Sequence, residues 1–171
     1  LFPWMTVWQN AAYGLTMRKR PKAEIEEIVG HFLSRVGMTR FAKAYPHQLS
    51  GGMRQRVSIA RAFANDPDIL LMDEPFSALD VQNKVMLQEE LLRIFDATHK
   101  TILFVTHAIE EAILLGDEVV VMTARPGRIK DVIAVDLPRP RSLEMVNSKE
   151  FGALFDRTFH LIREEVTKSM A

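Results

Sequence analysis

The stretch Ile69-Leu70-Leu71-Met72-Asp73-Glu74-Pro75 decides how the fold is interpreted. Its first four residues form a short continuous apolar run, which is typical of a strand covered on both faces of a sheet. Two acids follow at once, and ligands of open parallel sheets bind outside the carboxyl ends of the strands. Asp73 could hold Mg²⁺ through water or phosphate oxygens, and Glu74 could orient or deprotonate an attacking water. Taken alone, the two acids are equally well interpreted as solvated loop residues.

The residues after this stretch alternate between helical and strand patterns. We expect a helix over 81–96, a strand over 101–106, a short helix over 108–115 and a third strand over 118–123. Such alternation predicts a parallel α/β architecture. The second strand leads into His107, which would emerge at the same edge of the sheet as the two acids. A lone histidine in that place is more often a capping or packing residue.

Helices are also expected before the apolar run. Residues 22–37 have apolar side chains at helical spacing, and a second helix is expected over 53–64. Ser50-Gly51-Gly52 stands directly before this second helix, where unpaired backbone N–H groups and the helix dipole favour an anion. For these three residues alone, an ordinary serine cap is the commoner interpretation.

The chain is expected to have three parts. Residues 1–65 form a helical part, and residues 66–125 form the α/β part. Residues 126–171 form a C-terminal part, in which 129–137 is an edge strand or hairpin and a last amphipathic helix follows Asn147-Ser148. The opening residues are apolar where a natural terminus is usually polar and loose, so we expect that the chain was cut from a longer one.

Composition excludes several classes of protein. The 171 residues are 47% hydrophobic and 26% charged, as in an ordinary globular domain. Formal net charge is zero, which weakens any nucleic-acid-binding interpretation. The absence of cysteine excludes a disulfide framework and a thiolate metal site. No apolar run approaches the roughly 18 residues of a membrane span, so contact with a membrane is expected to be indirect.

Four motifs together resemble one family. The strings Leu49-Ser50-Gly51-Gly52-Met53-Arg54-Gln55-Arg56, Ile69 to Pro75 and Ser77-Ala78-Leu79-Asp80, followed by His107, have the order and spacing found in the ATP-binding cassette (ABC) ATPases. By this resemblance they are the signature, Walker B, the D-loop and the switch histidine. The opening Leu1 to Val7 would then lie just after the Q-loop. The implied α/β fold is the C-terminal part of a P-loop NTPase of the ABC type, comprising the helical subdomain and half of the parallel-sheet core.

The resemblance implies ATP and Mg²⁺ as cofactors and gives each matching residue a role. Asp73 would support the metal, Glu74 would be the general base for water, and His107 would contact the γ-phosphate. In a head-to-tail dimer the signature would close on the nucleotide held by the other subunit. The residues assigned to cofactor binding, including the D-loop aspartate at the dimer contact, are Ser50, Gly51, Gly52, Gln55 and Asp80.

One departure from the family pattern is the missing phosphate loop. No Gly-x-x-x-x-Gly-Lys-Ser/Thr motif occurs in the 171 residues, so the first β-subdomain with Walker A is expected to be absent. The chain by itself is therefore expected to be inactive, whereas the complete subunit would hydrolyse ATP. Gln9 is expected to stand at the start of a helix rather than to serve as the Q-loop glutamine.

Two further strings indicate the branch of the family. Met122 to Ile129, followed by Leu137 to Arg141, resembles the importers of nitrate, taurine, aliphatic sulfonates and related small anions. The implied partners are a second ATPase subunit, a transmembrane permease and, indirectly, a solute-binding protein, with no nucleic acid. The implied location is peripheral, on the cytoplasmic face of the inner membrane. Phe2, Trp4 and Met5 are candidates for the permease contact, although such aromatic residues are more often part of a core.

Two alternatives are weighed against the importer. An ABC-type head of a DNA-repair or chromosome-organising protein shares the signature, Walker B and D-loop. However, the interval before Walker B has no room for a coiled coil or a zinc insert, and the balanced charge offers little to a phosphate backbone. A non-catalytic chain that completes a partner's ATP site stays open on the sequence alone.

Overall fold

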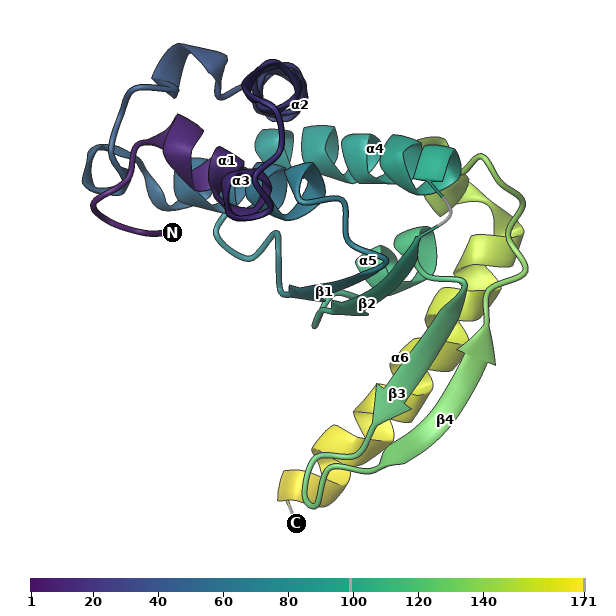
Figure 1. The fold of residues 1–171 in the computed structure, drawn as a ribbon. Helices are drawn as coiled ribbons and strands as arrows, with labels where there is room; N and C mark the ends of the chain where they lie inside the picture. The colour runs from purple at the N-terminus through teal and green to yellow at the C-terminus, as the bar shows by residue number, and fades with distance from the viewer. Residues whose placement is uncertain (99, 171) are drawn as a thin grey trace. The chain divides into compact units, whose positions relative to one another are not determined.

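The computed structural model describes residues 1–98 and 100–170 (Figure 1). Contacts divide them into two compact units. The first unit comprises Leu1–Glu90 and Lys100–Leu103, and the second comprises the other described residues. The three-part division expected from the motifs remains a proposal, since it follows sequence signals rather than contacts.

Three α-helices build most of the first unit. They are α1 (Val7–Met17), α2 (Lys22–Arg35) and α3 (Gly51–Ala64), with short 3₁₀ turns at Thr39–Phe41 and Pro46–Gln48. Helices α1 and α2 pack on α3 and on each other. The helices predicted over 22–37 and 53–64 are confirmed to within two residues at each end. Their buried faces and that of α1 share a core of Val7, Ala11, Leu15, Ile25, Val29, Leu33, Val57, Ala60 and Phe63.

Helix α1 begins with a capping box. The Thr6 hydroxyl accepts the Gln9 backbone N–H at 3.2 Å, and the Gln9 side chain accepts the Thr6 N–H at 2.8 Å. Gln9 is thus confirmed as a residue of the helix start. The fully buried Asn10 side chain fastens the segment before the helix by bonding to the N–H and C=O of Phe2 and the C=O of Met5.

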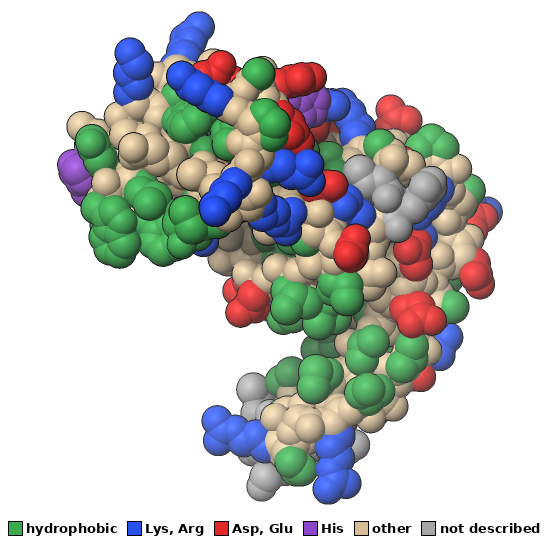
Figure 2. Space-filling model, viewed as in Figure 1, with side chains coloured by type: hydrophobic (Ala, Val, Ile, Leu, Met, Phe, Trp, Pro, Cys, Tyr) green, Lys and Arg blue, Asp and Glu red, His purple; other side chains and the backbone are tan. Residues whose placement is uncertain are grey.

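Strand β1 (Ile69–Asp73) pairs with β2 (Thr101–Val105), which follows helix α4 (Val81–Thr98). Leu70 and Met72 are buried, but Ile69 is 62% exposed and Leu71 is 71% exposed. The expectation that this strand is covered on both faces is therefore wrong for the residues that the structure describes. Nothing among them packs over the second face, and Figure 2 shows hydrophobic side chains at the surface there.

The second unit consists mainly of a hairpin and a long helix. Helix α5 (Ile109–Leu115) leads into β3 (Glu118–Met122), which pairs antiparallel with β4 (Ile129–Ala134). A 3₁₀ turn at Leu143–Asn147 and helix α6 (Lys149–Met170) follow. The hairpin option for 129–137 is confirmed. Within the described residues β3 has β4 as its sheet neighbour, because the chain turns over 123–128 and returns antiparallel to β3, and the two strands form a sheet separate from the β1–β2 pair.

The buried Arg141 side chain joins the end of α5 to the segment after β4. This side chain is 1% exposed. The guanidinium donates to main-chain carbonyls at the end of α5 and beyond β4, namely those of Ile113, Leu114, Gly116, Val135 and Leu137. Burial, with a smaller contribution from the neighbouring Arg139, lowers the pKa of Arg141 from its ordinary value. Arginine nevertheless keeps its charge at neutral pH, so these carbonyls receive charge-assisted hydrogen bonds.

Candidate functional site

The corner Ser50-Gly51-Gly52 forms the start of α3. Ser50 is the N-cap, and its hydroxyl accepts the Met53 N–H at 3.2 Å. The ordinary capping interpretation therefore holds within the chain. Ser50 and Gly51 are exposed, so the N–H groups of the first turn also remain accessible to an anion from outside. Arg54 braces the corner by donating to the Leu49 carbonyl at 2.6 Å.

Gly52 brings this corner against the residues of the predicted D-loop. A Cβ at position 52 would lie 3.2 Å from the Ala78 carbonyl oxygen and 3.2 Å from Leu79 Cδ2. Both contacts are tighter than ordinary van der Waals contact, so glycine permits an approach that a larger residue would strain. The signature and D-loop strings, which are separated by a strand in the sequence, are thus neighbours in the first unit.

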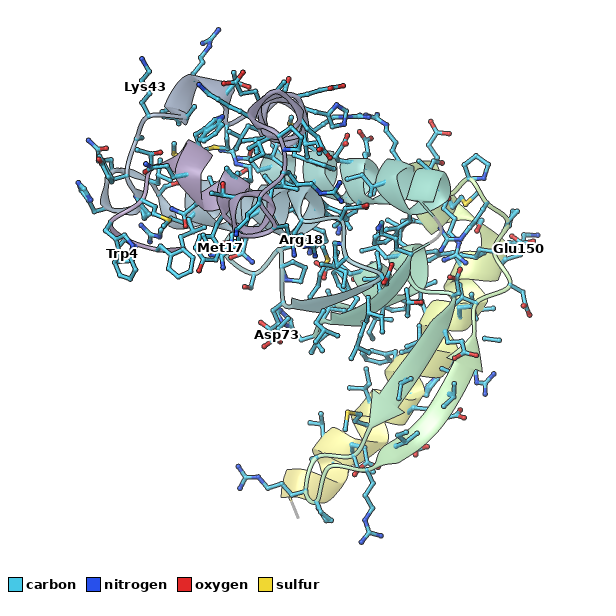
Figure 3. All side chains as sticks on the ribbon, viewed as in Figure 1. Trp4, Met17, Arg18, Lys43, Asp73 and Glu150 are labelled. Atoms are coloured by element: carbon cyan, nitrogen blue, oxygen red, sulfur yellow. The ribbon has the colours of Figure 1, made fainter. Side chains whose placement is uncertain are left out.

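The two acids lie where β1 ends. Asp73 is the last residue of the strand and is exposed (Figure 3). Glu74 is half-buried and has a φ of 43°, a left-handed conformation that is uncommon for a residue other than glycine. Such conformations persist where surrounding contacts hold them, and they gather at functional sites.

The Glu74 carbonyl oxygen is the contact that holds this turn. It accepts the Ser77 N–H at 3.2 Å, the Ser77 hydroxyl at 3.0 Å and the Gln55 side-chain amide at 3.4 Å. The last of these bonds links α3 to the acids. Sequence reasoning assigned Gln55 to the nucleotide and did not foresee its bond to Glu74, nor the bond from Ser77. No local pattern announces a side chain that reaches a main-chain carbonyl 19 residues away.

Asp80 caps α4. One carboxylate oxygen accepts the Asn83 N–H at 3.0 Å, and the other accepts the Asn83 side-chain amide at 2.6 Å. Both bonds lower the pKa of Asp80, and the bond from the Asn83 backbone N–H has the larger effect. The residue is exposed, so a role at a dimer contact is compatible with the cap and remains a prediction.

His107 belongs to the second unit. It directly follows Thr106, the first residue after β2, and its side chain is exposed. The hydroxyl of Thr106 donates to the Glu111 carboxylate and accepts the Ala108 N–H. The residues on both sides of His107 are thus joined through one hydroxyl group.

The acids fit Mg²⁺ in one limited way. Among the side chains that the structure describes, no group of three or more His, Cys, Asp or Glu could hold a metal ion. Mg²⁺ usually keeps several waters and takes phosphate oxygens together with one or two carboxylates. An exposed Asp73 at the end of a strand is therefore compatible with one protein ligand of a phosphate-bound ion. In the helices that the structure describes, no segment has the length and apolar character needed to cross a membrane.

Comparison with known proteins gives one consistent family. Residues 1–77 match the family model described as "ABC transporter". An uncharacterised ABC transporter ATP-binding protein of Methanocaldococcus jannaschii is 49% identical over 170 residues, covering 99% of this chain and 62% of that protein. A nitrate import ATP-binding protein of Synechocystis is 40% identical, covering 98% of this chain and 65% of that protein. A taurine import ATP-binding protein of Rhizobium johnstonii is 45% identical, covering 97% and 62%.

A solved structure agrees with the sequence relatives. An ATP-binding cassette in a dimeric post-hydrolysis state, bound to ADP and phosphate, superposes with a TM-score of 0.71 at 31% identity. The match covers 81% of this chain and 60% of that one. The chain thus spans less than two thirds of these proteins. The predicted fold class, part of a P-loop ATPase of the cassette type, is confirmed, and none of the relatives named above supports a DNA-repair head.

Proposed function

The chain belongs to the ATP-binding cassette (ABC) transporter ATPases, and from that membership we propose that it is part of a subunit that hydrolyses ATP to drive import of a small anion. Nitrate, taurine and alkanesulfonates are the proposed class of solute, since nitrate and taurine import proteins are among the relatives. The observation that carries the proposal is the junction at Glu74, where the end of β1, the signature helix α3 and the turn at Ser77 meet.

Each site residue has a proposed task. Glu74 accepts a proton from the attacking water, and its turn conformation directs the side chain. Asp73 contributes a carboxylate oxygen to Mg²⁺, and His107 donates a hydrogen bond to the terminal phosphate of ATP. Bound Mg·ATP supplies the phosphoryl group and the charge neutralisation that its transfer to water requires.

The signature corner acts across a subunit interface in this proposal. Ser50 and Gly51 are exposed, as a surface that meets a second subunit must be. Their backbone N–H groups at the start of α3, with Gly52 and Gln55 behind them, close on ATP held by the other subunit of a head-to-tail dimer. Asp80 joins the same interface. Because no phosphate-loop motif occurs in the 171 residues, we propose that they do not turn over ATP by themselves.

A transmembrane permease is the second proposed partner, with a solute-binding protein acting through it, so that the subunit lies peripherally on the cytoplasmic face of the inner membrane. The exposed aromatic segment near the N-terminus supports this. Trp4 is 70% exposed and Met17 is 60% exposed, and both lie at the surface near α1 (Figure 3). The Phe2 ring lies 5.6 Å from that of Trp4, and the Arg61 guanidinium lies 4.6 Å from the centre of the Phe2 ring. Trp4 is therefore not a core residue in this chain.

The experiment uses the complete subunit, reconstituted with its permease in vesicles. ATP hydrolysis and uptake of labelled nitrate, taurine and an alkanesulfonate are measured for wild type and Glu74→Gln. We expect hydrolysis and uptake of at least one of these anions to fall together by about 100-fold or more, because a general base contributes on the order of 10² to 10⁴ in rate. Asp68→Asn, which alters an exposed acid just before β1, is the matched control and should behave as wild type.

Two results would contradict the proposal. Glu74→Gln could hydrolyse ATP at the wild-type rate, or wild type could hydrolyse ATP without moving any of the three solutes. For the permease contact, Trp4→Ala should weaken assembly and leave the melting temperature unchanged. Phe41→Ala, which alters an exposed aromatic elsewhere in the first unit, should leave both assembly and the melting temperature unchanged.

A further inference from the structure

A buried carboxyl group lies beside the histidine turn. Glu111 is 5% exposed, on the first turn of α5, whereas its neighbour Glu110 is exposed. A buried carboxyl group is costly unless hydrogen bonds compensate it. The Thr106 hydroxyl supplies such a bond, and a helix N-terminus also favours a carboxylate.

Thr106 relays this bond to the main chain on the far side of His107. Its hydroxyl accepts the Ala108 N–H at 3.0 Å while it donates to Glu111. The Thr106 hydroxyl therefore links the residue before His107 to the residue after it. Because the hydroxyl donates its proton to the buried Glu111 carboxylate, its oxygen is left to accept the Ala108 N–H. The His107 side chain itself is exposed, so the two bonds constrain the backbone that carries it.

We propose that Thr106 and Glu111 are positioning residues for His107, holding its backbone so that the imidazole meets the terminal phosphate of ATP. The inference rests on the proposed role of His107. It gives the pair a task beyond stabilising the turn before α5. Misplacing a reacting group by about 1 Å can cost on the order of 100-fold in rate, so a loosened turn lowers turnover more than ATP affinity.

The test compares variants of the complete subunit. We expect Thr106→Val and Glu111→Ala each to lower kcat by about ten-fold or more, with KM for ATP changed less than about two-fold. Thr106→Ser and Glu111→Gln keep an oxygen in the required place and should retain most of the activity. Glu110→Ala, the exposed neighbour, should equal wild type.

A double-mutant cycle separates the positioning of His107 from a purely stabilising role of the Thr106 hydroxyl. If Thr106 acts through His107, then Thr106→Val should change kcat less than about two-fold in a His107→Ala background. An equal loss in both backgrounds would mean that the hydroxyl only stabilises α5, and would overturn the proposal. Wild-type kcat in Thr106→Val would overturn it as well.

Failure of the proposed function would show separately. In that case wild type lacks ATPase activity, or His107→Ala keeps it, whatever happens at Thr106. Hydrogen exchange then decides the positioning itself. Thr106→Val should raise exchange at the Ala108 amide by about ten-fold or more, because the hydroxyl that accepts the Ala108 N–H is removed. Unchanged exchange there would overturn the proposal, and Glu110→Ala serves again as control.

Discussion

Replacing Arg141 by methionine should destabilise the second unit strongly. Methionine is a similarly long, unbranched side chain but offers no donors to the five carbonyls that Arg141 contacts. Each buried acceptor left without a partner costs about 1–3 kcal/mol, so the loss of the two shortest bonds, to Gly116 at 2.6 Å and Val135 at 3.1 Å, costs about 2–6 kcal/mol. Asp117 adds little to this sum, because its side chain is 76% exposed and returns to water. We therefore expect a loss of about 2–6 kcal/mol.

Urea unfolding followed by circular dichroism measures this loss as a lower midpoint at constant slope. At about 2–4 °C per kcal/mol, the melting temperature should fall by roughly 4–24 °C. Arg141→Lys should lose about 2 kcal/mol, because one ammonium cannot reach carbonyls on both sides. Arg139→Met is the matched control, since that side chain is 31% exposed and its ion pairs are worth less than about 1 kcal/mol. A loss below about 0.5 kcal/mol in Arg141→Met would refute the reasoning.

Three further outcomes can be measured on the same protein. Gly116→Ala should lower the unfolding free energy by about 1–3 kcal/mol, because the added Cβ would meet the Ala112 carbonyl oxygen at 2.8 Å. Gly152→Ala, where the added Cβ meets open space, should raise the unfolding free energy by about 0.5–1 kcal/mol. Urea titration measures both changes. Asp80 has a lowered pKa in the folded state, so its contribution to stability as a cap is present above the ordinary value of 3.8 and is lost as pH falls through the folded pKa. Asp80→Asn should therefore reduce the fall in melting temperature at acid pH. An unchanged pH profile would contradict this prediction. Lys130, paired with Glu164 at 2.8 Å, has a raised pKa, so its contribution to stability is complete below pH 10.5 and is lost as pH rises through the folded pKa. Lys130→Met should remove this fall in melting temperature at alkaline pH. A fall as steep as in wild type would count against the pair.

Regular elements were predictable where local pattern decides them. Helices α2 and α3 and strand β1 follow from apolar spacing, and Gln9 was identified as a residue of a helix start. The full extent of α1 was not predicted, although Thr6 and Gln9 form the sequence signature of a capping box. The motif spacing was sufficient to identify the family.

What the sequence could not supply depends on distant partners. Whether Ile69 is covered depends on what packs against the sheet, and periodicity carries no such information. The pairing of β3 with β4 depends on the turn over 123–128, whereas the alternation of helical and strand patterns predicts only that a third strand exists. Arg141 and Gln55 bond to main-chain carbonyls that lie 25 and 19 residues away in the sequence. Every residue type carries such a carbonyl, so the sequence does not show which ones are the acceptors.

The Glu74 turn has a practical consequence for enzymology. Its main-chain carbonyl oxygen accepts the bonds from Ser77 and Gln55, and these bonds do not involve the carboxylate of the side chain. Exchanging the carboxylate for an amide of the same shape should therefore keep these main-chain bonds while removing the group proposed to accept the proton. Such a variant is suited to capturing the nucleotide-loaded state for imaging, since lost turnover would not come from a collapsed loop.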